Sequence, residues 1–148
     1  MSNYDNDNTL IVRTDYSDEK AWNELCLAIE RSSERYIKYG EGIENYRDYI
    51  DYIEDPRLNN LSVKQVQSLL PELVCRSEIF EIFIIDRQSL SHRDRPILVV
   101  DMSDPARTFR VVPSQIWSVD ANLSISNMDF EEFADNVDED GIFRGFEE

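Results

Sequence analysis

The sequence has few cysteines, no long apolar run and no positively charged start. Its 148 residues include only 2 cysteines, Cys26 and Cys75, which lie far apart in apolar surroundings and suit a reducing compartment better than a disulfide scaffold. No apolar run approaches the roughly 18 residues of a membrane span. The first residues, MSNYDNDN, are polar and acidic, unlike the n-region of a secretory signal. We therefore expect a cytoplasmic protein without a membrane anchor.

Basic residues are also scarce. The chain has 15 lysines and arginines against 31 acidic residues, a formal net charge of −16 and a pI of about 4.3. This charge opposes binding to nucleic acid and to anionic membrane surfaces, whereas it favours attraction to a basic protein. Half of the excess lies in residues 129–148, which hold nine acids and one base. A solvated helix face followed by a frayed terminus explains that segment most simply.

Motifs for nucleophilic or nucleotide chemistry are missing as well. The sequence contains no P-loop, no G-x-G-x-x-G and no G-x-S-x-G, and 4 glycines are too few for a typical phosphate-binding loop. The single histidine, His92, lies in the polar stretch SLSHRDRP and is predicted to be an ordinary surface residue. Neither cysteine has a histidine nearby in the sequence. We expect no cofactor.

The apolar residues, 41% of the chain, are patterned as in a folded protein. We expect a disordered acidic tail over residues 1–8 and a single α/β domain over 9–148. Residues 9–14 form a predicted strand, and Asp15 and Ser17 are candidate caps for the helix that follows. A second helix begins at Ser62, which forms a capping-box pair with Gln65, and Pro71 limits its length. Residues 43–55 fit both a helix and a strand; the preceding glycines and the closing Asp-Pro favour a strand.

The second half of the chain contains three more predicted strands, over residues 79–87, 97–102 and 108–112, the last two forming a hairpin. Residues 113–127 are predicted to be irregular, with Asn122 and Asn127 as structural caps. A third helix begins at Asp129, with Glu132 at its capping-box position. The predicted fold is one mixed sheet of about five strands, parallel at the front and an antiparallel meander at the back, covered by about three helices. The predicted core includes Trp22, Leu25, Ile29, Ile84, Val99, Val100, Phe130 and Phe133.

Two stretches resemble an uncharacterised bacterial domain-of-unknown-function family that is common in actinobacteria. They are LIVRTDYSDEKAW near the start and FRVVPSQIWSVDANLSISNMDFEEFADNVDEDGIFRGF at the end, and the similarity covers almost the full length. The resemblance implies a small cytoplasmic α/β domain. It implies no activity and no catalytic residues, so it assigns no role to Asp15 or Asn127 beyond a place in the motifs.

The C-terminal segment also matches part of a calcium-binding loop. The pattern places five residues at positions 1, 3, 5, 6 and 12 of an EF-hand: Asn136, Asp138, Asp140, Gly141 and Glu147. Three features oppose the match, because position 1 is Asn rather than Asp, position 9 is Arg144, and no exit helix follows Glu147. A helix followed by an Asp-Gly turn explains the same residues, so we predict no metal site here.

Three aspartates form a second candidate site. If the first three strands are parallel, Asp15, Asp55 and Asp86 lie at their carboxyl ends, where open α/β sheets bind ligands. Carboxylates gathered there would hold a hard cation or shift one another's pKa for acid–base catalysis. The simpler interpretation is that Asp15 caps a helix, Asp55 starts a turn and Asp86 pairs with a neighbouring base.

Two classes of function follow from these patterns. The preferred hypothesis is a non-enzymatic interaction protein, immunity-like or inhibitor-like, that binds a basic partner through Glu131, Asp135 and Glu139; a solvent-facing Trp117 would add a binding spot. The alternative is a small metal-dependent or acid–base enzyme built on Asp15, Asp55 and Asp86. The sequence leaves the oligomeric state open.

Overall fold

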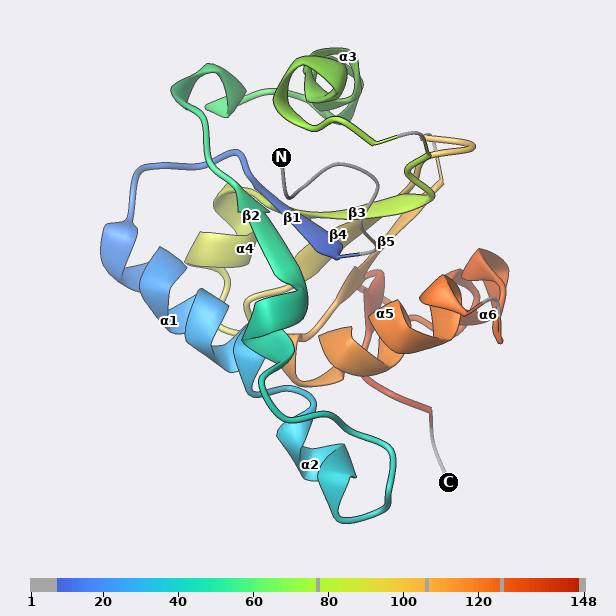
Figure 1. Cartoon of the computed structure of the whole chain (residues 1–148). Helices are drawn as coiled ribbons and strands as arrows, with labels where there is room; N and C mark the ends of the chain where they lie inside the picture. The colour runs from blue at the N-terminus through green and yellow to red at the C-terminus, as the bar shows by residue number, and fades with distance from the viewer. Residues whose placement is uncertain (1–7, 77, 106, 126, 147–148) are drawn as a thin grey trace.

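The computed structural model describes residues 8–76, 78–105, 107–125 and 127–146, and Figure 1 shows helices packed on both sides of a central sheet. The predicted tail lies outside the described residues except for Asn8. The sheet has six strands in the order β2-β1-β3-β4-β5-β6. Their bounds are β1 Thr9–Arg13, β2 Ile50–Ile53, β3 Glu81–Ile85, β4 Ile97–Asp101, β5 Thr108–Val111 and β6 Ile142–Phe143.

The strand directions confirm the predicted mixed sheet. β1 pairs in parallel with both β2 and β3, and β3, β4 and β5 form an antiparallel meander. β6, which the sequence did not predict, pairs in parallel with β5. Every strand except β4 therefore runs in one direction. We call the side of the sheet where β1, β2, β3, β5 and β6 end the carboxyl edge, and the opposite side the amino edge.

Helices cover the two faces of this sheet unequally. α3 (Val63–Leu73) packs on one face, and α1 (Glu19–Glu30), α5 (Ile116–Ser124) and α6 (Phe130–Ala134) pack on the other (Figure 1). Side chains of a strand alternate between the faces, so Leu10 and Val12 contact the α3 layer whereas Ile11 contacts the α1 layer. The eight core residues predicted from the sequence are all buried.

The two longest helices begin and end close to their predicted positions. The N-cap of α1 is Asp18, whose side chain accepts a 3.0 Å hydrogen bond from Ala21 N–H, rather than Asp15 or Ser17. α3 starts with the predicted capping box of Ser62 and Gln65. It continues past Pro71 to Leu73, since proline removes only its own N–H donor and Val74 N–H still donates to Leu70 O.

Several short elements differ from the prediction. Residues 43–55 form a strand only over β2, which follows the 3₁₀ turn η1 (Tyr46–Tyr49). The strand predicted over 79–87 ends at Ile85, since Asp86 caps the short helix α4 (Arg87–Ser91). The helix predicted to begin at Asp129 is the short α6, which ends at Ala134. A further short helix, α2 (Glu34–Ile37), was not predicted. The two other 3₁₀ turns are η2 (Pro56–Leu58) and η3 (Pro113–Gln115).

The largest difference is α5, in the segment that the sequence predicted to be irregular. Ile116 and Val119 lie on its buried side and anchor it to the sheet, and Asp120 is buried next to them. Asn122 Nδ2 donates to Ser118 O, and Asn127 Nδ2 donates to Asn122 Oδ1. The asparagines therefore stabilise a helix and its end. In the described part of the chain, no helix combines the length and apolar character needed to cross a membrane.

Candidate functional site

The three predicted aspartates do follow parallel strands at the carboxyl edge. Asp15 follows β1 and is buried; its Oδ1 accepts a 2.8 Å hydrogen bond from Ser17 N–H. Its Oδ2 lies 3.5 Å from Arg87 Nε, an ion pair with an exposed guanidinium. Asp15 thus holds the turn that leads from β1 into α1, and it is tied to the start of α4.

Asp55 and Asp86 are each held by an arginine. Asp55 accepts hydrogen bonds from the backbone and the guanidinium of Arg57, which keep the pKa of its carboxyl below the usual value. Asp86 caps α4, and its Oδ2 lies 2.7 Å from Arg110 Nη2. Burial raises the pKa of Asp86, but its hydrogen bonds with Arg110 and Ser89 lower it by a larger amount, so the pKa lies below its usual value. Over the described ranges, no three His, Cys, Asp or Glu side chains are grouped as a metal site would require.

The calcium-loop residues form a turn instead. Asp138 Oδ1 accepts from Asp140 N–H at 2.8 Å and from Ile142 N–H at 3.0 Å, and Asp138 Oδ2 accepts from Arg144 Nε at 2.7 Å. Asn136 Nδ2 donates to Glu132 O at 2.7 Å. Glu147 lies outside the described residues. The carboxylate of Asp138 is therefore fully used by the protein, and the bond with Arg144 holds its pKa below the usual value.

We expect no binding of micromolar calcium at this segment. A calorimetric titration at micromolar calcium should give no heat, because Asp138 would have to release Arg144 and two backbone N–H groups before it could coordinate a cation. A one-site isotherm that disappears in Asp138→Asn would contradict this prediction and assign the segment a metal-binding role.

A different acidic site lies at the amino edge of the sheet. It is a groove of about 340 Å³ between the start of β3, the turn joining β4 to β5, and the segment joining α5 to α6. We call it the acidic groove. It is lined by four carboxylates, one arginine and several apolar side chains: Glu81, Asp101, Asp129, Glu131, Arg107, Phe80, Leu123, Met128 and Phe130, together with Ser103 and Ser124.

Glu81 and Asp101 are the central acids of the acidic groove. They are directly opposite one another in the antiparallel register of β3 and β4. Burial, together with the negative charges of Asp120 and Asp101, raises the pKa of Glu81 to about 7. The pKa of Asp101 is lowered instead. Burial raises it, but hydrogen bonds from Ser103 and Arg107 lower it by a larger amount. The groove thus pairs an ionised carboxylate with one that is half-protonated near neutral pH.

Asp120 lies within the protein behind the groove. Its carboxylate accepts hydrogen bonds from the hydroxyl groups of Thr9, Tyr46 (2.9 Å) and Ser124 (3.2 Å). Burial raises its pKa, and these three hydrogen bonds partly offset that effect. The network joins the start of β1 to η1 and α5. It fixes the end of α5, from which Leu123 and Ser124 extend into the groove.

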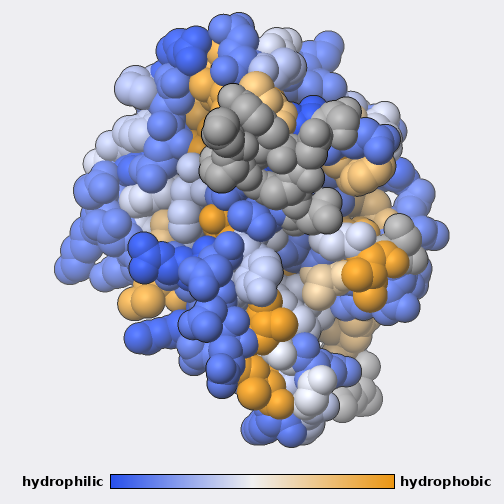
Figure 2. Space-filling model, in the orientation of Figure 1, coloured by the Kyte–Doolittle hydropathy of each residue, from blue (hydrophilic) through white to orange (hydrophobic). Residues whose placement is uncertain are grey.

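Exposed apolar side chains border the acidic groove. Phe80, in the groove lining, is 68% exposed, and Ile125, which follows Ser124, is 74% exposed. Figure 2 shows a mostly hydrophilic face with a hydrophobic patch where α5 ends. Large apolar side chains exposed next to a groove mark a surface suited to contact with another protein.

The predicted partner-binding residues lie partly at this site. Glu131 lines the acidic groove and forms an ion pair with Arg107. Asp135 and Glu139 are exposed on the segment that continues from it. Trp117 does not line the groove: it is half-buried on α5, and its ring centroid lies 5.2 Å from that of Tyr36. Glu81 was not predicted as a site residue; its signal in the sequence is an acid at the start of an otherwise apolar strand.

Cys26 and His92, the residues considered for nucleophilic catalysis, are not arranged as a catalytic pair. Burial raises the pKa of the Cys26 thiol to about 12, so the thiolate is a negligible fraction at neutral pH. The ring Nδ1 of His92 accepts a 3.0 Å hydrogen bond from Asp94 N–H, which holds the loop before β4. These contacts give no nucleophile and base in hydrogen-bonding distance.

Comparison with known proteins identifies the family. The model of a family described as a domain of unknown function (DUF6924) matches residues 8–146, which is nearly the whole chain. No curated protein matches the chain. The chain belongs to this domain-of-unknown-function family.

Proposed function

We propose that this member of the family is a non-enzymatic protein-interaction domain whose acidic groove receives a basic segment of a protein partner. The observation that carries the proposal is the composition of the groove: four carboxylates, two of them paired with the single arginine Arg107, next to apolar side chains, with Phe80 and Ile125 exposed. A lysine or arginine flanked by an apolar side chain fits this chemistry, because its charge meets the carboxylates while the apolar side chain covers Phe80.

Glu81 gives the groove a specific preference for a cation. A carboxyl whose pKa lies near 7 is partly neutral in the free protein, which reduces the repulsion between Glu81 and Asp101. Arg107 already pairs with Asp101, so a partner's ammonium or guanidinium group placed beside Glu81 would favour the ionised form of Glu81. Binding of the basic partner should therefore release a proton near neutral pH.

The surrounding charge supports the same kind of partner. The chain carries a net charge of −16; Glu131 lines the groove, and Asp135 and Glu139 are exposed on the segment that follows it in the sequence. Such a field accelerates the encounter with a positively charged protein, and salt screens it over about 8 Å at physiological ionic strength. An immunity-like or inhibitor-like role against a basic target in the cytoplasm is consistent with this surface and with two free cysteines.

The alternative enzyme built on Asp15, Asp55 and Asp86 has no observation in its favour. Asp15 holds a turn, Asp55 is bound by Arg57, and Asp86 caps α4 while it pairs with Arg110. Local hydrogen bonds and ion pairs occupy all three side chains; Asp15 Oδ2 accepts no hydrogen bond and faces only the ion pair with Arg87. We therefore do not propose this function.

The test is a comparison of two triple variants with the same change in net charge. Glu131→Gln, Asp135→Asn and Glu139→Gln together should slow association with the basic partner by about threefold to tenfold at low salt, and should flatten its salt dependence. The dissociation rate should change little. The matched control is Glu34→Gln, Glu41→Gln and Glu44→Gln, three exposed acids on or near α2. The partner is recovered by a low-salt pull-down, and rates are measured by stopped flow.

Three results would contradict the proposal. If both triple variants slow association equally, only the net charge matters and the acidic groove has no special role. If no protein is retained at low salt, or if the groove variant binds with unchanged rates, the acidic surface serves solubility alone. A second variant, Phe80→Ser, tests the apolar part of the site and should increase the dissociation rate without altering the salt dependence.

A further inference from the structure

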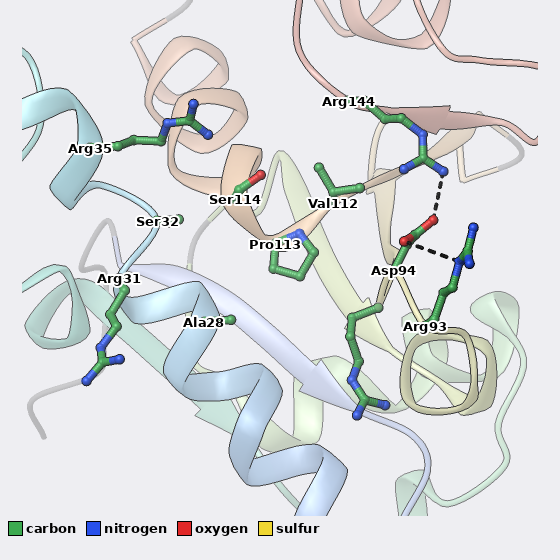
Figure 3. Close-up of a pocket in the computed structure, with 11 residues that line it drawn as sticks. Ala28, Arg31, Ser32, Arg35, Arg93, Asp94, Val112, Pro113, Ser114 and Arg144 are labelled. Atoms are coloured by element: carbon green, nitrogen blue, oxygen red, sulfur yellow. Dashed lines mark hydrogen bonds and ion pairs between the residues drawn. The ribbon is translucent and has the colours of Figure 1, made fainter.

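A strongly basic cleft stands out in this acidic protein. Five of the 15 basic residues line one cleft of about 610 Å³. We call it the arginine cleft, and it is defined by Arg31, Arg35, Arg93, Arg95 and Arg144, with Ala28, Ser32, Asp94, Val112, Pro113 and Ser114 (Figure 3). Its volume is that of a pocket for a small molecule.

The arginine cleft lies at the carboxyl edge of the sheet, opposite to the acidic groove. Val112 directly follows β5 and Arg144 directly follows β6, while residues 93–95 lie just before β4. The end of α1 and the start of α2 supply Arg31 and Arg35. Open α/β sheets bind ligands at this edge, because the loops there can vary while the strands hold them in place.

The charges of the cleft are not balanced by its own acids. Asp94 is the one carboxylate in the lining; its Oδ2 lies 3.0 Å from Arg144 Nη2, and its Oδ1 lies 4.0 Å from Arg93 Nε. Arg144 also pairs with Asp138, and Arg95 pairs with Glu24. Within the described ranges of the chain, Arg31 and Arg35 form no ion pair, although acids are abundant.

The orientation of the side chains leaves guanidinium groups open to a ligand. Figure 3 shows Arg35 on one side of Pro113 and Ser114, and Arg93 and Arg144 on the other, with Asp94 between the latter two. The side chain of Arg93 is 91% exposed. Ala28, Val112 and Pro113 form an apolar floor between the two sets of charges. A bound molecule can thus meet positive charge at both ends and apolar atoms in the middle.

We propose that the arginine cleft binds a small phosphate-bearing molecule. The planar guanidinium presents paired N–H donors that match the oxygens of a phosphate, and several of them around one cleft favour a ligand with more than one negative charge. Arg35 and Arg93 supply donors from opposite sides, Arg144 is positioned by Asp94, and the hydroxyl of Ser114 adds a neutral donor. The floor accepts the uncharged part of the ligand.

The experiment is calorimetric titration of the whole chain with inorganic pyrophosphate at fixed ionic strength. The wild type should bind it, and Arg35→Gln and Arg93→Gln should each raise the Kd by about tenfold, the size expected for loss of a charged hydrogen bond. Arg47→Gln is the matched control, since Arg47 is exposed, carries the same charge and lies outside the cleft; its Kd should equal that of the wild type. Both cleft arginines are exposed, so their variants should fold normally.

Titrations with citrate and sulfate separate phosphate from other oxyanions. Pyrophosphate should bind at least about tenfold more tightly than either anion. Absence of binding by pyrophosphate at millimolar concentration overturns the proposal, as does an equal loss of affinity in Arg47→Gln, which would indicate only long-range attraction. Citrate binding as tightly as pyrophosphate would overturn the phosphate class. None of these outcomes depends on the acidic groove, which lies at the other edge of the sheet.

Discussion

Replacement of Phe133 with alanine is expected to lower the free energy of unfolding by about 3–5 kcal/mol. Phe133 on α6 is fully buried, and its ring centroid lies 5.1 Å from that of Phe143 on β6 and 6.1 Å from that of Phe109 on β5. Removal of the ring leaves a cavity that the rigid strands cannot close. It should also loosen the attachment of β6, which pairs with the sheet over only two residues.

Urea unfolding followed by circular dichroism measures this effect. The control is Phe146→Ala, in the same aromatic cluster but 48% exposed, with its ring centroid 5.7 Å from that of Phe133. Because water already reaches Phe146, its variant should lose about 1 kcal/mol. An unchanged unfolding midpoint for Phe133→Ala would mean that α6 is not packed against β5 and β6 as the structure shows.

The sequence predicts those elements best in which several local signals coincide. α1 has an acid cap followed by a stripe of Trp22, Leu25 and Ile29, and α3 combines a capping box with an apolar stripe. The direction of the strands followed from their order, because helices between strands favour parallel crossovers and the short hairpin before β5 requires an antiparallel pair.

The missed elements have weaker or non-local signals. α5 has Ile116 and Val119 at helical spacing, but its serine, asparagine and β-branched residues have low helix propensity; burial against the sheet overrides that preference. α4 contains five residues and follows an apolar run that suggested a longer strand. β6 depends on pairing with β5, more than 30 residues earlier in the chain, which no local pattern reveals.

The candidate sites, like the helices and strands, were predictable only where the signal is local. The sequence order placed Asp15, Asp55 and Asp86 at one edge correctly, but the orientation of their carboxylates depends on neighbours such as Ser17 and Arg57. The arginine cleft brings together residues from four separate segments, so it has no spacing that a motif could capture. The sequence placed half of the excess negative charge in residues 129–148, but it predicted no basic cleft. The fold instead separates an acidic groove at the amino edge from a basic cleft at the carboxyl edge.

Replacement of Glu81 with glutamine is expected to make the stability less dependent on pH. The pKa of Glu81 is about 7 in the folded protein, against an ordinary value of 4.5. A raised pKa means that the folded state holds the proton more tightly than the unfolded chain. The resulting stabilisation is complete below about pH 4.5 and is lost as the pH rises through 7. This loss amounts to about 3 kcal/mol, from roughly 1.4 kcal/mol for each pH unit between the two values.

The glutamine variant remains neutral at every pH and keeps a similar shape. It should exceed the wild type by less than about 1 kcal/mol at pH 5 and by up to about 3 kcal/mol at pH 8, where the wild type must bury an ionised Glu81 beside Asp101. Urea unfolding of both proteins between pH 5 and pH 8 measures the difference. The lowered pKa values of Asp86 and Asp101 act below about pH 4, outside this range, so the difference reports the titration of Glu81 together with its charge coupling to Asp120. A difference that is constant across this range would show that Glu81 is ionised and hydrated throughout, and the acidic groove would then lack its proton-linked preference for a cation.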